Sequence, residues 1–440
     1  MRAAAASAPM TLSPARAVER ARMAMLWLVG FSGALVFTEP SAYEIFALGA
    51  MFVFFASGLP LRPGHLPLLV ILLLYNFGLS IAVIPVVGEP KTALWVAVSW
   101  FLAATTLFFA CVMAEDTAKR MRVLMSGYMA AAMLASLIAI LSYFRLMPSA
   151  DTFLLYGRAK CTFNDPNVLG PFLVLPGLMA IYRVLSGRLR DIVIGGAQTG
   201  IIAIAVLLTF SRGAWGHYAF SAMVFVGALF VLSNNARERT RIVAATIGAA
   251  AMLGLVLAAL LSMKGVGTLF TERASLDQSY DMGQLGRFGR HILGFQLALD
   301  TPWGLGPFQF AKIFPEDPHN VYLNAFMTGG WLGGLCYLVL VLTTLAAGFR
   351  AAMRATPWRP YMLAALATFI AVAGEGAIID TDHWRLSCSR AGGRWGGATA
   401  AQRAYPPAAT AASRPAPKPM PAPRIEPAPA RTGILRIVVK

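Results

Sequence analysis

Long apolar runs, separated by short polar segments, follow one another along most of the chain. Each run has about the 17–25 residues that a helix needs to cross the hydrocarbon core of a bilayer. Helices suit this setting because they satisfy their own backbone hydrogen bonds where water is absent. The pattern predicts an all-α, polytopic integral membrane protein with about eleven transmembrane helices. We expect them at residues 23–38, 42–59, 66–87, 92–114, 123–144, 167–185, 192–210, 213–233, 242–262, 320–347 and 361–379.

Composition excludes a single water-soluble domain. Of the 440 residues, 58% are hydrophobic and only 13% are charged, whereas roughly a quarter of the residues of a soluble domain are charged. The four cysteines show no CxxC or Cys/His spacing. We therefore expect neither a disulfide framework nor a metal site.

The positive charges gather in alternate loops. With the N-terminus in the cytoplasm, 17 Lys and Arg residues fall in the cytoplasmic segments and five in the short outer loops. This asymmetry is the positive-inside rule, and it predicts a cytoplasmic N-terminus. The net charge of +17 then reflects topology and a basic tail. No stripe of basic residues interleaved with aromatics is present, so no nucleic-acid partner is expected.

The runs and charges divide the chain into five parts. A basic cytoplasmic N-terminus precedes a first bundle of about nine spans. A large periplasmic loop separates this bundle from the last two spans, and a tail follows. The expected boundaries are 1–22, 23–262, 263–319, 320–380 and 381–440.

The large loop is longer than a connection requires. Loops of more than fifty residues in a compact protein are functional or disordered in most cases. An apolar-periodic stretch, Phe288 to Leu299, predicts one or two short helices packed on the outer membrane surface.

The apolar pattern stops abruptly after Arg385. The following residues are rich in Ala, Pro, Arg and Gly, and such a segment buries too little apolar surface to order itself. The tail is therefore expected to be disordered, and a twelfth span is missing where it would return the chain to the cytoplasm. One hypothesis is a shift of reading frame near Leu386; the alternative is a natural disordered tail.

Two polar motifs adjoin the outer ends of spans. In Thr162-Phe-Asn-Asp-Pro-Asn167, Asn164 or Asp165 before Pro166 suits the start of a helix, and the motif is either a helix cap or part of a site. Phe210-Ser-Arg-Gly213 places Arg212 on the side where positive charge is disfavoured. Anion binding is therefore favoured for Arg212 over a role as an interfacial anchor.

Further candidates lie in and beyond the large loop. Arg287 and Arg290 are three residues apart, so in a helix they share a face and could clamp a diphosphate; the alternative is a solvated face. His319 stands where the loop meets the next span, and imidazole suits proton transfer near neutral pH. An ordinary loop histidine is the alternative. Glu375 is an ionisable residue within a predicted span and hence a functional candidate.

With these motifs the sequence resembles the O-antigen ligase and polymerase superfamily of bacterial envelopes. The resemblance covers about residues 150–380 and rests on TFNDPN, FSRG, GLGPFQF (Gly304 to Phe310) and PHNVYLNAFMTGGWLGG (Pro318 to Gly334). Members of this family are similar in having about twelve spans and a large periplasmic loop.

The resemblance implies glycan transfer on the periplasmic face of the bacterial inner membrane, without metal or cofactor. The donor would be a glycan on undecaprenyl diphosphate, and the acceptor a hydroxyl of lipid A–core or of another glycan. His319 would deprotonate that hydroxyl, while Arg212 and one or both of Arg287 and Arg290 would hold the diphosphate. Asn167, Asn320 and Tyr322, which belong to the motifs, are expected to bind substrate.

Three functions remain open at this point. A ligase and an O-antigen, capsule or exopolysaccharide polymerase share one scaffold and differ in acceptor. A transporter or lipid flippase would instead require ionisable residues deep in several spans and related halves. The sequence shows few such charges and no internal repeat, which favours chemistry at the membrane surface.

Overall fold

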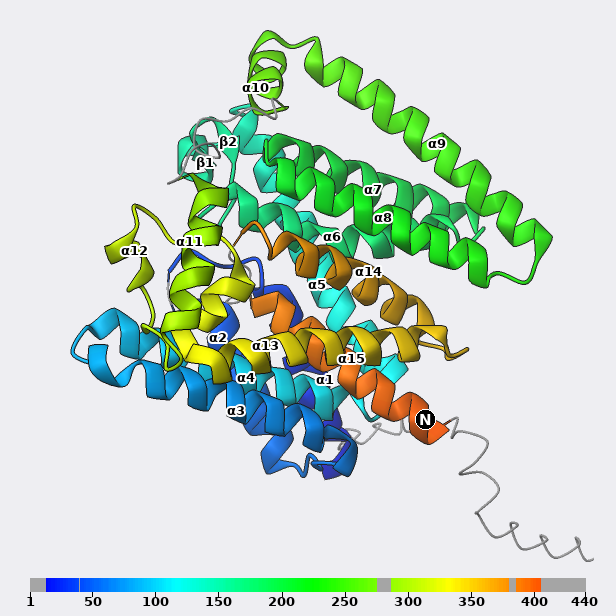
Figure 1. The fold of residues 1–440 in the computed structure, drawn as a ribbon. Helices are drawn as coiled ribbons and strands as arrows, with labels where there is room; N and C mark the ends of the chain where they lie inside the picture. Colours follow the sequence, from blue (N-terminus) through cyan, green and yellow to red (C-terminus); the bar gives the residue numbers. More distant parts are fainter. Residues whose placement is uncertain (1–12, 39, 275–285, 380–384, 405–440) are drawn as a thin grey trace, which may run out of the picture.

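The computed structural model describes residues 13–38, 40–274, 286–379 and 385–404. Within these ranges the chain is helical (Figure 1) apart from one antiparallel hairpin, β1 (Leu154–Leu155) and β2 (Arg158–Ala159), and three short 3₁₀ turns. The 3₁₀ turns are Pro63–His65, Ile84–Val86 and Ala150–Phe153. The helices at the expected spans are α1 (Pro14–Ser32), α2 (Ala42–Ala56), α3 (Leu66–Ala82), α4 (Pro90–Met113), α5 (Thr117–Tyr143), α6 (Pro166–Val184), α7 (Leu189–Leu208), α8 (Arg212–Leu232), α9 (Ala236–Leu261), α13 (Val321–Met353) and α14 (Arg359–Glu375).

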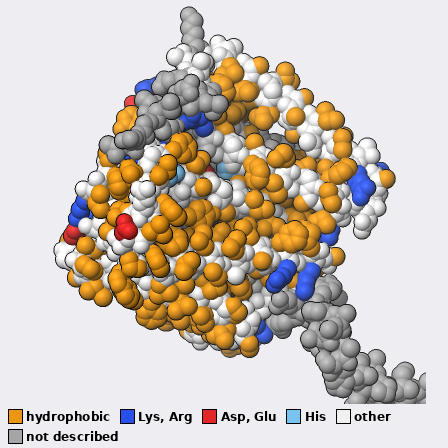
Figure 2. Space-filling view, viewed as in Figure 1, with side chains coloured by type: hydrophobic (Ala, Val, Ile, Leu, Met, Phe, Trp, Pro, Cys, Tyr) orange, Lys and Arg blue, Asp and Glu red, His pale blue; other side chains and the backbone are white. Residues whose placement is uncertain are grey.

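The polytopic all-α fold is confirmed, but the number of long apolar helices is smaller than eleven. Among the described residues, eight helices are long and apolar enough to cross a membrane. Of the other three, α2 and α14 have 15 and 17 residues, or about 23 and 26 Å at 1.5 Å per residue, and α1 carries four charged residues in its first half. The face visible in Figure 2 is mostly apolar, with Lys and Arg near its margins, as a surface against lipid requires.

A further helix stands where the sequence predicts a disordered tail. Residues Arg385–Ala404 form α15, which packs against α4, α13 and α14 (Figure 1). Arg394 is completely buried there and donates from Nη1 to the carbonyl oxygen of Ala365 at 3.0 Å. With 20 residues, α15 is about 30 Å long. It follows α14, where the sequence predicts that a span is missing, but it is not among the eight helices that are long and apolar enough to cross a membrane. The rest of the tail, 405–440, lies outside the described residues, and the reading-frame hypothesis stays a hypothesis.

Small residues let α15 approach α4 closely. A Cβ atom on Gly392 would lie 2.1 Å from the carbonyl oxygen of Thr106, and one on Gly396 would lie 2.5 Å from that of Ala110. Two glycines four residues apart on a helix face are typical of close helix contacts in membranes. The contact with α4 is therefore a backbone-to-backbone contact made through these two positions.

Gly392→Ala is expected to destabilise the protein, whereas Gly393→Ala is not. The first substitution forces a methyl group into the backbone of α4, and overpacking of this kind costs about 1–3 kcal/mol. A Cβ atom on Gly393 meets nothing within 4 Å. Thermal midpoints of the two purified variants in one detergent test this. Equal midpoints would show that α15 does not pack on α4 as described.

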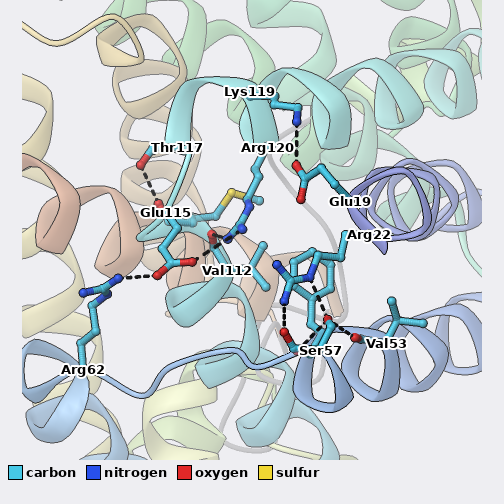
Figure 3. A network of polar contacts seen from close by, with 12 residues as sticks. Glu19, Arg22, Val53, Ser57, Arg62, Val112, Glu115, Thr117, Lys119 and Arg120 are labelled. Carbon is cyan, nitrogen blue, oxygen red and sulfur yellow. Dashed lines mark hydrogen bonds and ion pairs between the residues drawn. The ribbon is translucent and has the colours of Figure 1, made fainter. Parts of the chain in front are cut away.

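A network of charged side chains joins α1, α2, α4 and α5 at one end of the bundle, called the basic end below (Figure 3). Arg62 forms ion pairs with Glu115, which also lies 3.7 Å from Arg120. Nearby, Lys119 donates to Glu19 at 2.6 Å and Arg22 donates to Ser57. These cations come from three segments expected on one side of the membrane. The structure gathers them at one end, as the positive-inside pattern requires.

The opposite end, called the loop end below, carries the large loop. This loop contains α10 (Lys264–Ala274), α11 (Arg287–Asp300) and α12 (Phe310–Ile313). An ion pair between Lys312 and Glu89, 2.5 Å apart, ties α12 to the start of α4. The hydrogen bond from Lys312 is the main cause that lowers the pKa of the Glu89 carboxyl. Short helices in the loop are thus confirmed.

The α11 helix is amphipathic, with its apolar side outward. Phe288, Ile292, Phe295 and Leu299 are each more than half exposed and lie three or four residues apart. Arg290 lies on the opposite, buried side. A helix with an exposed apolar stripe is suited to lie in a membrane interface.

The α13 helix is broken at Gly330. Residues around the GLGPFQF motif pack against this break. Gly330 has φ +63° and ψ −165°, a conformation that only glycine adopts without strain. Trp331 donates its backbone N–H to the carbonyl oxygen of Pro302 at 2.9 Å, and Leu305 donates to that of Met327 at 2.7 Å. The segments that contain GLGPFQF and TGGWLGG are therefore joined by backbone hydrogen bonds, which anchor the end of the large loop to α13.

Candidate functional site

The hairpin of β1 and β2 joins the first two sequence motifs at the loop end. Arg158 donates from Nε to the carbonyl oxygen of Thr209 at 2.8 Å and from Nη2 to Oδ1 of Asn167 at 3.0 Å. Asp165 caps α6 by accepting from the backbone N–H of Asn167 at 2.6 Å. The predicted helix start at Pro166 is thus confirmed, and the Asn167 side chain is held beside the FSRG segment.

The FSRG segment forms a tight turn into α8. Phe210 has φ +46°, which is unusual for a residue with a side chain. Ser211 caps the helix by accepting from the N–H of Ala214 at 3.2 Å. Arg212 is therefore the first residue of α8 and half-buried. A cation at a helix N-terminus opposes the helix dipole, so this position is unfavourable unless an anion compensates it.

A buried acid–base pair joins α8 to α14 shortly after Arg212 in the chain. His217 of α8 contacts Glu375 at the end of α14, with 2.8 Å between Nδ1 and Oε2, and the two side chains are 1% and 9% exposed. The other ring nitrogen, Nε2, lies 3.2 Å from the carbonyl oxygen of Thr368. Since a carbonyl only accepts, Nε2 carries a hydrogen. A second proton then lies between Nδ1 and the carboxylate and makes the pair electrically neutral as a unit.

The glycine of FSRG makes room for this pair. A Cβ atom on Gly213 would lie 2.7 Å from Oε1 of Glu375. Any side chain at this position would push the carboxylate away from His217. The Ser-Arg-Gly sequence therefore combines a helix cap, a cation at the first position of the helix and space for a buried acid.

Gly213→Ala is expected to lower the thermal midpoint, while Gly216→Ala is expected to leave it unchanged or raise it. Both substitutions lie on α8 one turn apart, and alanine favours helix by about 1 kcal/mol over glycine. A Cβ atom on Gly216 meets nothing within 4 Å, whereas one on Gly213 displaces Glu375. Thermal unfolding of both purified variants measures the difference. A stabilised Gly213→Ala variant would mean that Glu375 does not occupy this position.

The start of α13 rests on the same end of α14. Val321 donates its N–H to the carbonyl oxygen of Gly376 at 2.7 Å, and the Tyr322 hydroxyl donates to that of Ala373 at 2.5 Å. Asn320 caps α13 by accepting from the N–H groups of residues 322 and 323. The end of α14 thus holds the FSRG segment on one side and the residues after His319 on the other.

His319 stands before this cap in a left-handed conformation, with φ +49°. One oxygen of Glu316, Oε2, is 3.9 Å from Nε2 of His319 and 2.9 Å from Nη2 of Arg290. Arg290 is almost fully buried, and its Nε has no hydrogen-bond partner among the described residues. Glu316 therefore lies between a histidine and an arginine that the sequence predicts as base and anion ligand.

A second histidine supports this cluster. His291 donates from Nε2 to the carbonyl oxygen of Pro318 at 2.7 Å. Burial, together with the positive charges of Arg287 and Arg290, lowers the pKa of His291. A lowered pKa favours the neutral form of His291. Its role here is to hold the chain just before His319.

The structure thus brings the predicted residues to the loop end in two groups. Asn167 is joined through Arg158 to Thr209, just before the FSRG segment that contains Arg212, and Gly213 of this segment adjoins Glu375. Arg290 and His319 lie in the group around Glu316. Arg287 is the first residue of α11, one turn before Arg290. The side chain of Asn320 and the hydroxyl of Tyr322 already serve as a cap and an interhelix contact, so substrate binding by these two stays a prediction.

Arg158, His217 and Glu316 were not found from the sequence. The signal for Arg158 was its position in an outer loop, where cations are rare. The partner of His217 is 158 residues away in sequence, and no motif marks either His217 or Glu316. In the described part of the chain no group of three or more His, Cys, Asp or Glu side chains could hold a metal ion.

Comparison with known families matches one part of the chain to a family model. Residues 199–338 match the model of the O-antigen ligase family. The predicted family resemblance is confirmed. The O-antigen ligase segment contains Arg212, Arg287, Arg290 and His319, and it ends within α13. No curated protein matches the chain.

The O-antigen ligase match supports a membrane glycan transferase of the ligase or polymerase type. Both groups at the loop end draw residues from this segment, while Asn167 and Glu375 lie outside it. The two groups therefore form the candidate active site, and the flanking helices α6 and α14 complete it.

Proposed function

We propose that the protein transfers a glycan from undecaprenyl diphosphate to a hydroxyl of lipid A–core or of another glycan. The reaction would take place on the periplasmic face of the bacterial inner membrane, with the N-terminus in the cytoplasm. The observation that carries the proposal is the cluster of His319, Glu316 and Arg290, which lies within the O-antigen ligase segment at the loop end.

In this mechanism His319 removes the proton of the acceptor hydroxyl. The oxygen forms a bond to the anomeric carbon of the donor sugar, and the bond from that carbon to the diphosphate oxygen breaks. The electron pair leaves with undecaprenyl diphosphate, and the proton stays on His319. Glu316 lies within 4 Å of Nε2, so its negative charge favours the imidazolium that forms.

Arginine side chains compensate the charge of the leaving diphosphate. Arg290 is fixed by Glu316 and has a buried Nε available for a further acceptor. Arg212 stands at the start of α8, and Arg287 lies one turn from Arg290. Guanidinium groups bind phosphate oxygens bidentately, and fixed donors of this kind stabilise developing charge without reorganisation.

The exposed apolar stripe of α11 suits a donor that arrives through the membrane. With Phe288, Ile292 and Phe295 in the membrane interface, the opposite face of the helix places Arg290 at the level of lipid phosphates. A polyprenyl diphosphate would then reach the arginines while its chain stays in the bilayer.

A surface-glycan profile tests the proposal. A strain lacking the gene is complemented with the wild type, with His319→Ala or with Lys91→Ala, which removes an exposed cation near the start of α4. We expect polymer on lipid A–core with the wild type and Lys91→Ala, and glycan retained on its lipid carrier with His319→Ala. Single repeat units on lipid A–core with loss of long chains would identify a polymerase instead. Unchanged lipid-linked glycan in the deletion strain would contradict both functions.

A further inference from the structure

A polar cavity of about 330 Å³ lies at the basic end of the bundle, whereas His319 lies at the loop end. The ends of α6, α7, α8 and α9 form it. Arg188 and Arg241 line it together with Asp191 and Glu238, and Leu229 and Ile242 complete its wall. The wall is therefore charged on one part and apolar on another.

The carboxylates of the cavity already have partners. Asp191 accepts from Nε of Arg183 at 2.9 Å, and Glu238 accepts from the hydroxyl of Ser233 at 2.7 Å. Neither Arg188 nor Arg241 forms an ion pair in the described ranges. Asp191 is therefore compensated by Arg183, whereas Glu238 keeps its negative charge because its partner is a neutral hydroxyl. Against Glu238, Arg188 and Arg241 leave the lining of the cavity with an excess of positive charge.

The loop between α6 and α7 is shaped to admit Arg241. Gly187 has φ +81°, and a Cβ atom there would lie 2.3 Å from Nη1 of Arg241. The same Nη1 reaches the carbonyl oxygen of Ser186 at the long distance of 3.5 Å. This leaves most of the donors of Arg241 without a close protein acceptor.

The apolar part of the cavity lies on the membrane side of the arginines. Leu229 precedes the end of α8 and Ile242 follows the start of α9, so both lie inside their spans. Beyond them, α9 exposes Val243 and Ile247. A ligand with an anionic head and an apolar chain would match this order of surfaces, whereas a free phosphate would use only the arginines.

We propose that this cavity binds the phosphate headgroup of an anionic glycerophospholipid between Arg188 and Arg241. Arginine recognises phosphate through paired hydrogen bonds, and basic pockets between transmembrane helices at the membrane surface are typical sites for anionic headgroups. The acyl chains lie along α9. The site is independent of the proposed glycan transfer, because it lies at the other end of the bundle.

Lipid-dependent thermal stability of the purified full chain tests the site. Phosphatidylglycerol, phosphatidylcholine or excess inorganic phosphate is added to the wild type, to Arg188→Ala/Arg241→Ala and to Arg190→Ala/Arg237→Ala. The second double variant removes the same charge from the start of α7 and from α9, but its residues do not line the cavity. Equal midpoints without lipid show that all three fold alike.

We expect phosphatidylglycerol to raise the midpoint of the wild type and of the control, and phosphatidylcholine to raise it less. Arg188→Ala/Arg241→Ala should need about tenfold more phosphatidylglycerol for the same rise. If inorganic phosphate alone reproduces the full rise, the site takes a free phosphate and the lipid assignment is wrong. The same lipid dependence in both double variants would overturn the site itself.

Discussion

Replacing His319 with alanine is expected to lower the rate of glycan transfer by about 10²–10⁴-fold, the usual contribution of a general base. More than a third of the His319 side chain is exposed, so the ring can reach an acceptor hydroxyl. Its Nε2 is 3.9 Å from Glu316, whose negative charge can balance the positive charge that the ring gains with the proton. The measurement is single-turnover transfer in membranes that contain equal amounts of each variant.

The comparison variant is His291→Ala. Nε2 of this histidine donates to the carbonyl oxygen of Pro318, so its role is to position the chain before His319. A smaller loss of transfer rate is therefore expected for His291→Ala than for His319→Ala. A larger loss for His291→Ala than for His319→Ala would reverse the two roles. An unchanged rate for His319→Ala would remove the base from the mechanism.

The second large effect is expected for Arg290. Arg290→Ala should lower transfer by about 10²–10³-fold, as loss of one fixed donor to a developing oxyanion does. Arg290→Lys should recover little, because an ammonium group cannot bind a diphosphate and Glu316 in the fork geometry of guanidinium. Rates measured across donor concentrations separate binding of the donor from stabilisation of the transition state.

Lys91→Ala is the matched control for Arg290, since it removes an exposed outer cation. Folding should survive the change at Arg290, because its partner Glu316 is 61% exposed and can be solvated. A rate for Arg290→Ala equal to that of Lys91→Ala would show that the diphosphate is held elsewhere.

Much of the fold could be predicted because its signals are local. Pro166 preceded by Asp165 predicted the start of α6, and the apolar period over 288–299 predicted α11. Apolar runs likewise located the spans, although α2 and α14, with 15 and 17 residues, are shorter than the eight long apolar helices. The order of the motifs pointed to the O-antigen ligase family, and all of the predicted site residues except Asn167 lie within the matched residues 199–338.

Features that depend on distant contacts could not be predicted in this way. The Arg385–Ala404 segment contains few apolar residues, so its composition indicated disorder, while the fit of Gly392 and Gly396 against α4 requires the partner helix to be known. His217 and Glu375 are 158 residues apart. Their pairing depends on α8 lying beside α14, which no periodicity in either segment reveals.

The most direct test of the account is transfer by the purified protein from a glycan on undecaprenyl diphosphate to lipid A–core. Free undecaprenyl diphosphate and transferred glycan are measured together in the same reaction. The account predicts that both appear in equal amounts with the wild type and that neither accumulates with His319→Ala. Release of undecaprenyl diphosphate at the same rate from both proteins, or transfer that survives the loss of His319, would contradict it.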